Sequence, residues 1–98
     1  MPAELLPAEG NVVRIAGTLD FASVTALYRQ TDALFTGREY LVLDGGAIDQ
    51  GSSAGVALLL EWLAEAHRRG CTLVFRGLPE SLLAVARLAG VEHLLTSD

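Results

Sequence analysis

Apolar residues along the chain form two patterns, short unbroken runs and longer stretches with a three- or four-residue repeat. The short runs are bounded by glycine or charge and rich in β-branched or aromatic residues, which is typical of buried strands. They cover residues 12–15, 40–43 and 72–75, and residues 3–6 can pair beside the first as a short edge strand. Residues 44–51, rich in Gly and Asp, are expected to form a loop.

Three stretches repeat their apolar residues at the spacing of an amphipathic helix. They span residues 20–37, 52–70 and 79–90, and each ends on a glycine or just before one. Asp20 or Ser23 can cap the first helix. Its expected apolar face holds Val24, Leu27, Tyr28, Leu34 and Phe35.

The resulting order of elements is ββαβαβα. Strands that alternate with helices pair in parallel through right-handed crossovers, and three helices can cover mainly one face of a small sheet. The apolar tail at residues 91–95 is expected to pack back on that sheet. We therefore predict an α/β fold in which a mixed sheet of about four strands forms a single domain, residues 1–98.

Composition and charge narrow the classes of partner. Apolar residues make up 51% of the chain, enough to offset chain entropy. Twelve acids against seven arginines, with no lysine, give a net charge of −5, which disfavours nucleic acid and suits a basic protein partner. The longest apolar run, residues 56–60, is far shorter than the roughly 20 residues that span a bilayer. The single Cys71 fits a reducing cytoplasm.

The segment before the second helix partly matches a phosphate-binding loop. Residues 46–53 follow a strand, precede a helix and have two glycines at the required spacing. The required lysine is replaced by Ser52, and Asp49 would place a negative charge in the phosphate cradle, so nucleotide hydrolysis is disfavoured. Asp44 and Asp49 are more simply turn residues that bond their own backbone than metal ligands.

Residues 51–55 also match the G-x-S-x-G pattern of a hydrolase nucleophile elbow. An elbow requires the strand to lead directly into the serine, whereas the expected loop separates Leu43 from Ser52. Of the two histidines, His67 lies about four turns further along the serine's own helix, and His93 lies in the tail. We therefore expect no enzyme activity, metal or cofactor.

The start of the second helix is better suited to regulation. Ser52 or Ser53 caps this helix, so its hydroxyl lies beside unpaired N–H groups at the positive end of the helix dipole. A phosphate attached there would be stabilised, and it would add charge to an edge that already holds Asp44 and Asp49. Alternatively, both serines are only helix caps.

The body of the second helix predicts a buried face and an exposed one. One arc of the helix holds the residues expected to pack on the sheet: Val56, Leu59, Leu60, Leu63 and Ala66. Leu58 and Trp62 lie off this arc, one turn apart, and are expected to be exposed. Because Trp is enriched in binding hot spots, this pair is a candidate interface; alternatively, Trp62 folds over a neighbouring loop.

These motifs resemble the signature of the STAS domain, the fold of anti-sigma-factor antagonists and of the cytoplasmic tails of sulfate transporters. The family pattern is a strand, D-L-S-x-V, a short gap and D-S-x-G-L, and residues 44–48 and 52–56 hold those places. Residues 17–20 match the family's G-x-L-D before its first helix. The resemblance covers nearly the whole chain and implies that Ser53 stands at the family's phosphorylatable Ser or Thr.

Within the family, residues 61–63 and 87–91 are most similar to the MlaB-like STAS subunit of Mla phospholipid-transport ABC complexes. This implies a non-catalytic cytoplasmic protein that binds and supports the ATPase of a complex for outer-membrane lipid asymmetry, and that is peripheral to the inner membrane through this partner. The alternative is an anti-sigma-factor antagonist that leaves its kinase when Ser53 is phosphorylated. Ser52 replaces the family's acidic residue, which favours the first function.

Under either function, the expected partner-binding residues are Asp49, Ser52, Ser53, Gly55, Leu58 and Trp62. Because Leu58 and Trp62 are expected to be exposed, they also allow the isolated protein to form a homodimer. We expect no direct insertion into a membrane.

Overall fold

The computed structural model describes residues 2–96 and contains one four-stranded sheet in the order β1-β2-β3-β4. β1 pairs antiparallel with β2, and β2, β3 and β4 are parallel, as the sequence predicted. The strands are β1 (Glu4–Pro7), β2 (Val12–Thr18), β3 (Tyr40–Gln50) and β4 (Thr72–Arg76).

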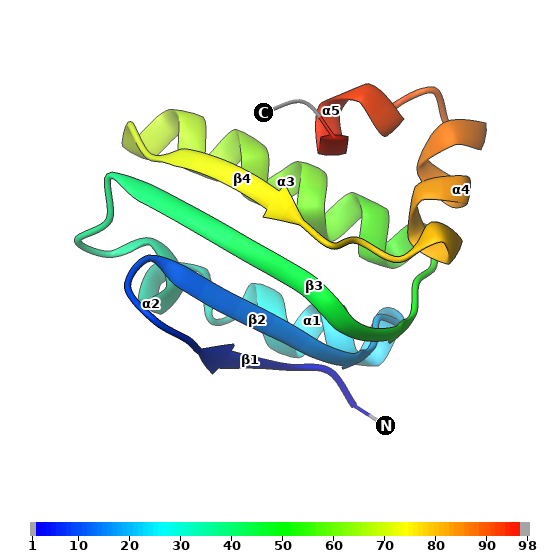
Figure 1. Cartoon of the computed structure of the whole chain (residues 1–98), viewed down its shortest axis with the longest axis horizontal. Coiled ribbons are helices and arrows are strands. Elements are labelled where there is room, and N and C mark those ends of the chain that lie inside the picture. Colours follow the sequence, from blue (N-terminus) through cyan, green and yellow to red (C-terminus); the bar gives the residue numbers. More distant parts are fainter. Residues whose placement is uncertain (1, 97–98) are drawn as a thin grey trace.

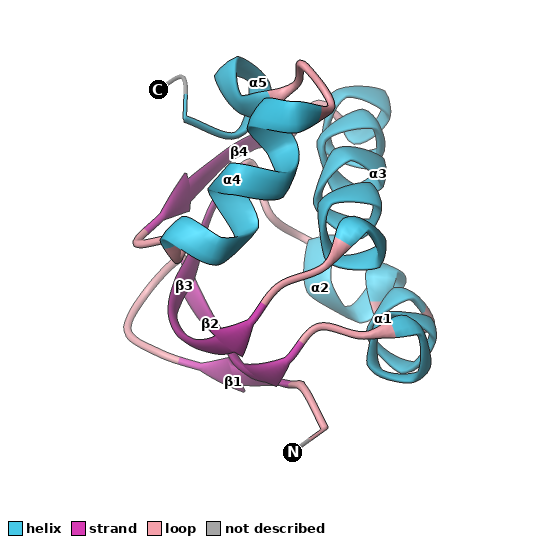
Figure 2. Cartoon of the chain, turned by 90° about the vertical axis from the view of Figure 1, so that its right-hand side faces the viewer, coloured by secondary structure: helices cyan, strands magenta, loops and turns pink. Residues whose placement is uncertain are grey.

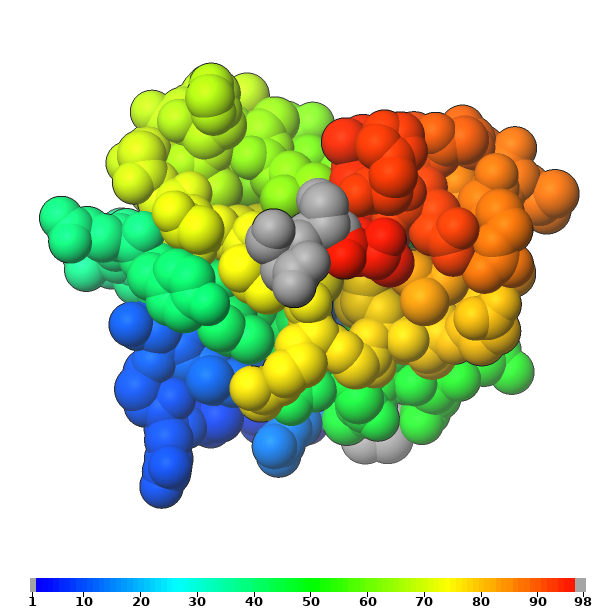
Figure 3. All heavy atoms as spheres, turned by 45° about the horizontal axis from the view of Figure 1, so that its top comes forward, coloured from blue at the N-terminus to red at the C-terminus, as the bar shows by residue number. Residues whose placement is uncertain are grey.

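Three helices lie on one face of the sheet, and two more lie at its end. The helices are α1 (Phe21–Tyr28), α2 (Thr31–Phe35), α3 (Ser53–Arg69), α4 (Glu80–Leu88) and α5 (Glu92–Thr96). α1, α2 and α3 pack side by side behind the sheet (Figure 1), and α4 lies across the end at which the parallel strands finish (Figure 2). α4 and α5 form one continuous surface next to β4 (Figure 3). No helix of the described residues has the length and apolar character needed to traverse a bilayer.

The first helix is divided, whereas the sequence predicted one helix over residues 20–37. Asp20 caps α1 as expected, because its carboxylate accepts the Ser23 N–H over 2.9 Å. The division follows Tyr28, whose carbonyl accepts the Thr31 hydroxyl over 2.6 Å. A Thr side chain that bonds the backbone in this way competes with helical hydrogen bonding and bends the chain.

The prediction of a loop at residues 44–51 is wrong, because β3 runs through this segment as far as residue 50. Arg14 of β2 lies opposite Asp44. Two residues later Ala16 lies opposite Ala47, so β3 holds one extra residue and forms a β-bulge. Gly45 and Gly46, which suggested a loop, occupy this bulge. Glycine in the interior of a strand often marks a bulge.

The tail also differs in form from its prediction. Residues 92–96 form the short helix α5, Leu95 is buried and α5 contacts β4, so the expectation that the tail packs back on the sheet is confirmed.

The prediction that Leu58 and Trp62 are exposed is wrong. Their exposed fractions are 5% and 0%, and both belong to the core between the sheet and the helices. The helical arc assumed that α3 packs only on the sheet, but α1 and α2 also pack against its side, which widens the buried face. Of the residues predicted to be buried, Val56, Leu59 and Ala66 are buried, and Leu60 and Leu63 are partly buried.

Candidate protein-binding site at the start of α3

The three parallel strands end at one edge of the sheet, and the loops that follow them lead into α1, α3 and α4. The N-termini of these helices therefore gather at the edge that faces the viewer in Figure 2. In α/β sheets this edge is where ligands and partners generally bind. The segment that sequence analysis selected, Asp49 to Gly55, lies here.

Ser52 is the N-cap of α3 and has extended backbone angles, φ −142° and ψ 178°. Its hydroxyl accepts the Gly55 N–H over 3.4 Å and donates to the Leu19 carbonyl over 2.7 Å. Ser52 therefore joins the β2–α1 loop to the start of α3. Of the two serines left open as the cap, Ser52 has this role.

Ser53 is the first residue of α3 and is exposed. Within residues 2–96, no hydrogen bond engages its hydroxyl, since Ser52 already caps the helix. The side chain is thus available to a partner or a modifying enzyme. Asp49, at the end of β3, is also exposed and adds negative charge nearby.

Gly51 and Gly55 shape this edge from within. A Cβ on Gly51 would lie 2.8 Å from the Cβ of Leu82 and 3.1 Å from its Cα, and one on Gly55 would lie 2.9 Å from the Cβ of Leu19. Both glycines let the chain pack tightly against α4 and the β2–α1 loop. Gly55, predicted to contact a partner, is buried, so any effect it has on binding is indirect.

A shallow groove of about 540 Å³ runs between α1 and α3, starting next to Ser53. Its lining residues are Val24, Thr25 and Tyr28 of α1 and Ala54, Ala57, Leu58 and Glu61 of α3. Tyr28 is 48% exposed, although it was predicted to lie on the apolar face of its helix. Phe21, the first residue of α1, is 77% exposed. Exposed aromatic residues beside an apolar groove are typical of protein interfaces.

We call Phe21, Tyr28, Ser53 and this groove the docking face. Sequence reasoning missed Tyr28 because it placed this residue on the apolar face of a single helix, and it did not single out Phe21. Phe21 carried a usable signal, since it directly follows the Asp20 cap and precedes the apolar repeat.

Asp44 was expected beside the regulatory Ser53, but Gly46 and Arg76 hold its carboxylate instead. Its carboxylate accepts the Gly46 N–H over 2.8 Å, so it bonds its own backbone as predicted, but it lies in β3 and not in a turn; it also pairs with Arg76 over 3.0 Å. The Gly46 N–H and then the Arg76 guanidinium lower the pKa of Asp44 below its usual 3.8. In the described part of the chain, no three His, Cys, Asp or Glu side chains converge as a metal site.

The expected loop between Leu43 and the serine of the elbow motif is absent, because β3 occupies this segment. β3 ends at Gln50 and only two residues separate it from Ser53, so no long loop lies between strand and serine. An elbow serine occupies a strained turn, but within residues 2–96 no residue other than glycine has a positive φ. Ser53 lies in an ordinary capped helix, which is not the geometry of this nucleophile.

Comparison with known proteins agrees with this fold. A family described as "Mlab, STAS domain" matches residues 5–96. No curated protein matches the chain.

The solved structures that share this fold include two similar chains. The first is the crystal structure of Mglu, with a TM-score of 0.58 and 22% identity, covering 74% of this chain. This chain spans only 18% of Mglu. The second is an anti-sigma factor antagonist from Mycobacterium paratuberculosis, with a TM-score of 0.71 and 20% identity over 95% of this chain and 80% of that one. The family match and the predicted STAS fold agree, and the chain therefore belongs to the family of MlaB-type STAS domains.

Proposed function

We propose that this protein is a non-catalytic subunit that binds the ATPase of an Mla-type phospholipid-transport ABC complex and supports its activity. The observation that carries the proposal is the docking face, an exposed apolar groove beside Ser53 in an MlaB-type STAS domain. Through this partner the protein would lie at the cytoplasmic side of the inner membrane.

Charge around the docking face indicates the kind of surface that fits it. Asp20 and Asp49 are exposed near its two helices, Glu61 is exposed but paired with Arg68 over 3.6 Å, and the chain has a net charge of −5. A complementary surface would place an apolar side chain in the groove and surround it with Lys or Arg, since complementary charge steers association. We therefore expect a basic rim on the ATPase.

A second function is favoured by one observation, the accessibility of Ser53. A phosphate on this first residue of α3 would face the N–H groups of the helix and add a charge of about −2 to the docking face. This would suit an anti-sigma-factor antagonist that leaves its kinase on phosphorylation. The position before it is Ser52, whose hydroxyl already serves as the cap, and the family match favours the first function.

Affinity purification of the tagged protein from native cells tests the proposal. We expect the ATPase of a lipid-transport complex among the captured proteins, and its loss when Tyr28→Ala is used as bait. Tyr40→Ala is the matched control, because Tyr40 is 44% exposed but lies at the opposite end of β3. Capture of a kinase in place of the ATPase, released by Ser53→Asp, would support the second function. Equal capture by the Tyr28→Ala and wild-type baits would refute the docking face.

A further inference from the structure

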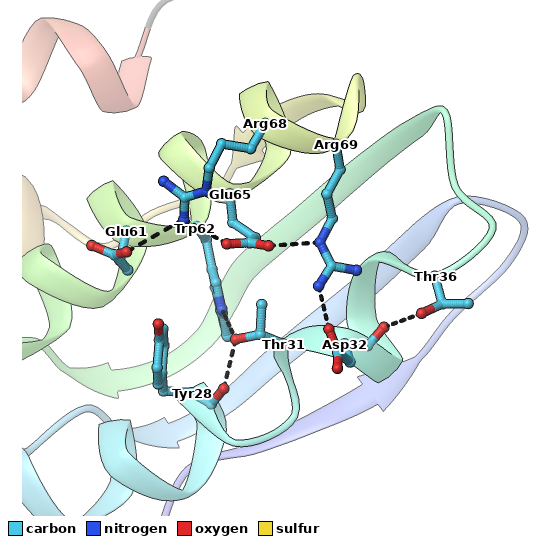
Figure 4. Close-up of polar contacts among 9 residues, drawn as sticks. All are labelled: Tyr28, Thr31, Asp32, Thr36, Glu61, Trp62, Glu65, Arg68 and Arg69. Carbon is cyan, nitrogen blue, oxygen red and sulfur yellow. Dashed lines mark hydrogen bonds and ion pairs between the residues drawn. The ribbon is translucent and has the colours of Figure 1, made fainter.

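Trp62 is buried, yet its indole nitrogen reaches the turn that separates α1 from α2. Nε1 donates to Thr31 Oγ1 over 3.0 Å, and the Thr31 hydroxyl donates to the Tyr28 carbonyl over 2.6 Å (Figure 4). A single hydroxyl therefore satisfies a buried indole N–H and a carbonyl at the end of α1. It connects the end of α1 to the middle of α3.

A second contact, between α3 and α2, lies close by and is more exposed than the bond from the Trp62 indole. Arg69 of α3 pairs with Asp32 of α2 and is also bonded by Glu65 over 2.7 Å (Figure 4). The Asp32 side chain is 88% exposed, and ion pairs in water contribute little to holding two helices together. The bond from the fully buried Trp62 indole to the Thr31 hydroxyl is partly buried and is therefore the stronger constraint.

This connection acts on the residue that forms the wall of the docking face. Tyr28 is the last residue of α1, and its side chain lines the groove while its carbonyl is held by Thr31. The position of the Tyr28 backbone relative to α3 sets the width of the groove, because the opposite wall is α3 itself.

We propose that Thr31 is a positioning residue for the docking face: its hydroxyl, held by Trp62, fixes the end of α1 and with it Tyr28. This inference rests on the proposed function for its biological purpose. Trp62 then contributes to partner binding from the core, through Thr31, and not as the exposed anchor that the sequence suggested.

The first test needs no partner. The chain has two tyrosines, so the full-length protein labelled with 3-fluorotyrosine gives one ¹⁹F NMR signal from Tyr28 and one from Tyr40, the internal reference. Thr31→Val keeps the shape of the side chain and removes the hydroxyl, and Thr31→Ser keeps the hydroxyl. Thr36→Val is the matched control, because the Thr36 hydroxyl bonds only the Asp32 carbonyl, over 2.6 Å.

We expect Thr31→Val to shift or broaden the Tyr28 signal and leave Tyr40 unchanged. Hydrogen exchange at the amides of Arg29 and Gln30 should rise about tenfold, since a lost hydrogen bond lowers the cost of local opening. Thr31→Ser should restore both readouts, and Thr36→Val should not alter them. If Thr31→Val folds poorly, trimethylamine oxide restores the compact state for the same comparison. A Tyr28 signal and exchange rates equal to wild type would overturn the proposal.

The second test separates this inference from the proposed function. With the co-purified ATPase as probe, Thr31→Val should bind about tenfold more weakly, and Thr31→Ser and Thr36→Val within about twofold of wild type. If Tyr28→Ala weakens binding and Thr31→Val does not, the positioning role is wrong while the docking face stands. If the wild-type protein does not bind the ATPase, the proposed function fails and the ¹⁹F result alone decides the role of Thr31.

Discussion

Replacing Trp62 by Ala gives the sharpest test of the packing between α3 and the α1–α2 pair. The side chain is 0% exposed, and a buried Trp removes about 150–250 Å² from water. At about 25 cal/mol per Å², this area corresponds to about 4–6 kcal/mol as an upper estimate. Measured Trp or Phe to Ala substitutions in cores cost about 3–5 kcal/mol. We therefore expect Trp62→Ala to lower the free energy of unfolding by about 3–5 kcal/mol.

Urea denaturation followed by far-UV circular dichroism measures this change, since the variant has no Trp to report by fluorescence. Phe21→Ala is the matched control, because Phe21 is also aromatic but is 77% exposed, and it should change stability by less than about 0.5 kcal/mol. If Trp62→Ala unfolds with the same midpoint and slope as wild type, the indole is not packed as described. An exposed anchor would give that result together with lost partner binding.

Three further predictions concern the edge around α3 and the β3–β4 pair. Ser52→Ala should cost about 1 kcal/mol of stability because it removes the N-cap, whereas Ser53→Ala should stay within about 0.5 kcal/mol, as measured by thermal unfolding; equal losses would contradict the assignment of Ser52 as the cap. Gly51→Ala should cost about 1–3 kcal/mol by forcing Leu82 and α4 outward, and in denaturation experiments the double variant with Leu82→Ala should lose less stability than the sum of the two single losses; strict additivity would argue against the contact. Asp44 has a lowered pKa, so its contribution to stability is present above its usual 3.8 and is lost as the pH falls through its lower folded-state value. Asp44→Asn should therefore flatten the acid side of a stability–pH curve, and an unchanged acid side would refute the contribution of this carboxylate.

Most of the fold follows from local sequence patterns. β-branched runs identified the strands, and the three-residue and four-residue repeats identified the helices, because each pattern depends only on which face of an element is buried. The prediction of a loop at residues 44–51 was wrong because the glycines of a β-bulge and those of a loop look alike in sequence. The bulge depends on the register of β3 against β2, a contact between distant segments.

The candidate site was predictable in part. Ser53 and Asp49 were predicted because a helix start leaves a recognisable capping pattern, and the structure shows that both are exposed. Trp62 was wrongly predicted to be exposed, because its burial depends on a second helix that packs beside α3. Tyr28 was wrongly predicted to be buried, because the chain turns directly after it. Neither packing angle nor this turn has a periodic signal, so the docking face emerges only in three dimensions.

Site-specific photocrosslinking at Tyr28 in native cells tests the central claim most directly. A photoreactive phenylalanine in place of Tyr28 lies in the groove wall, and the same residue in place of Tyr40 probes the far end of the sheet. The docking face predicts a crosslink from position 28, and none from position 40, to the ATPase of a phospholipid-transport complex. Crosslinks to that ATPase from position 40 alone would contradict the docking face, and a crosslink from position 28 to an anti-sigma kinase would contradict the proposed ATPase partner.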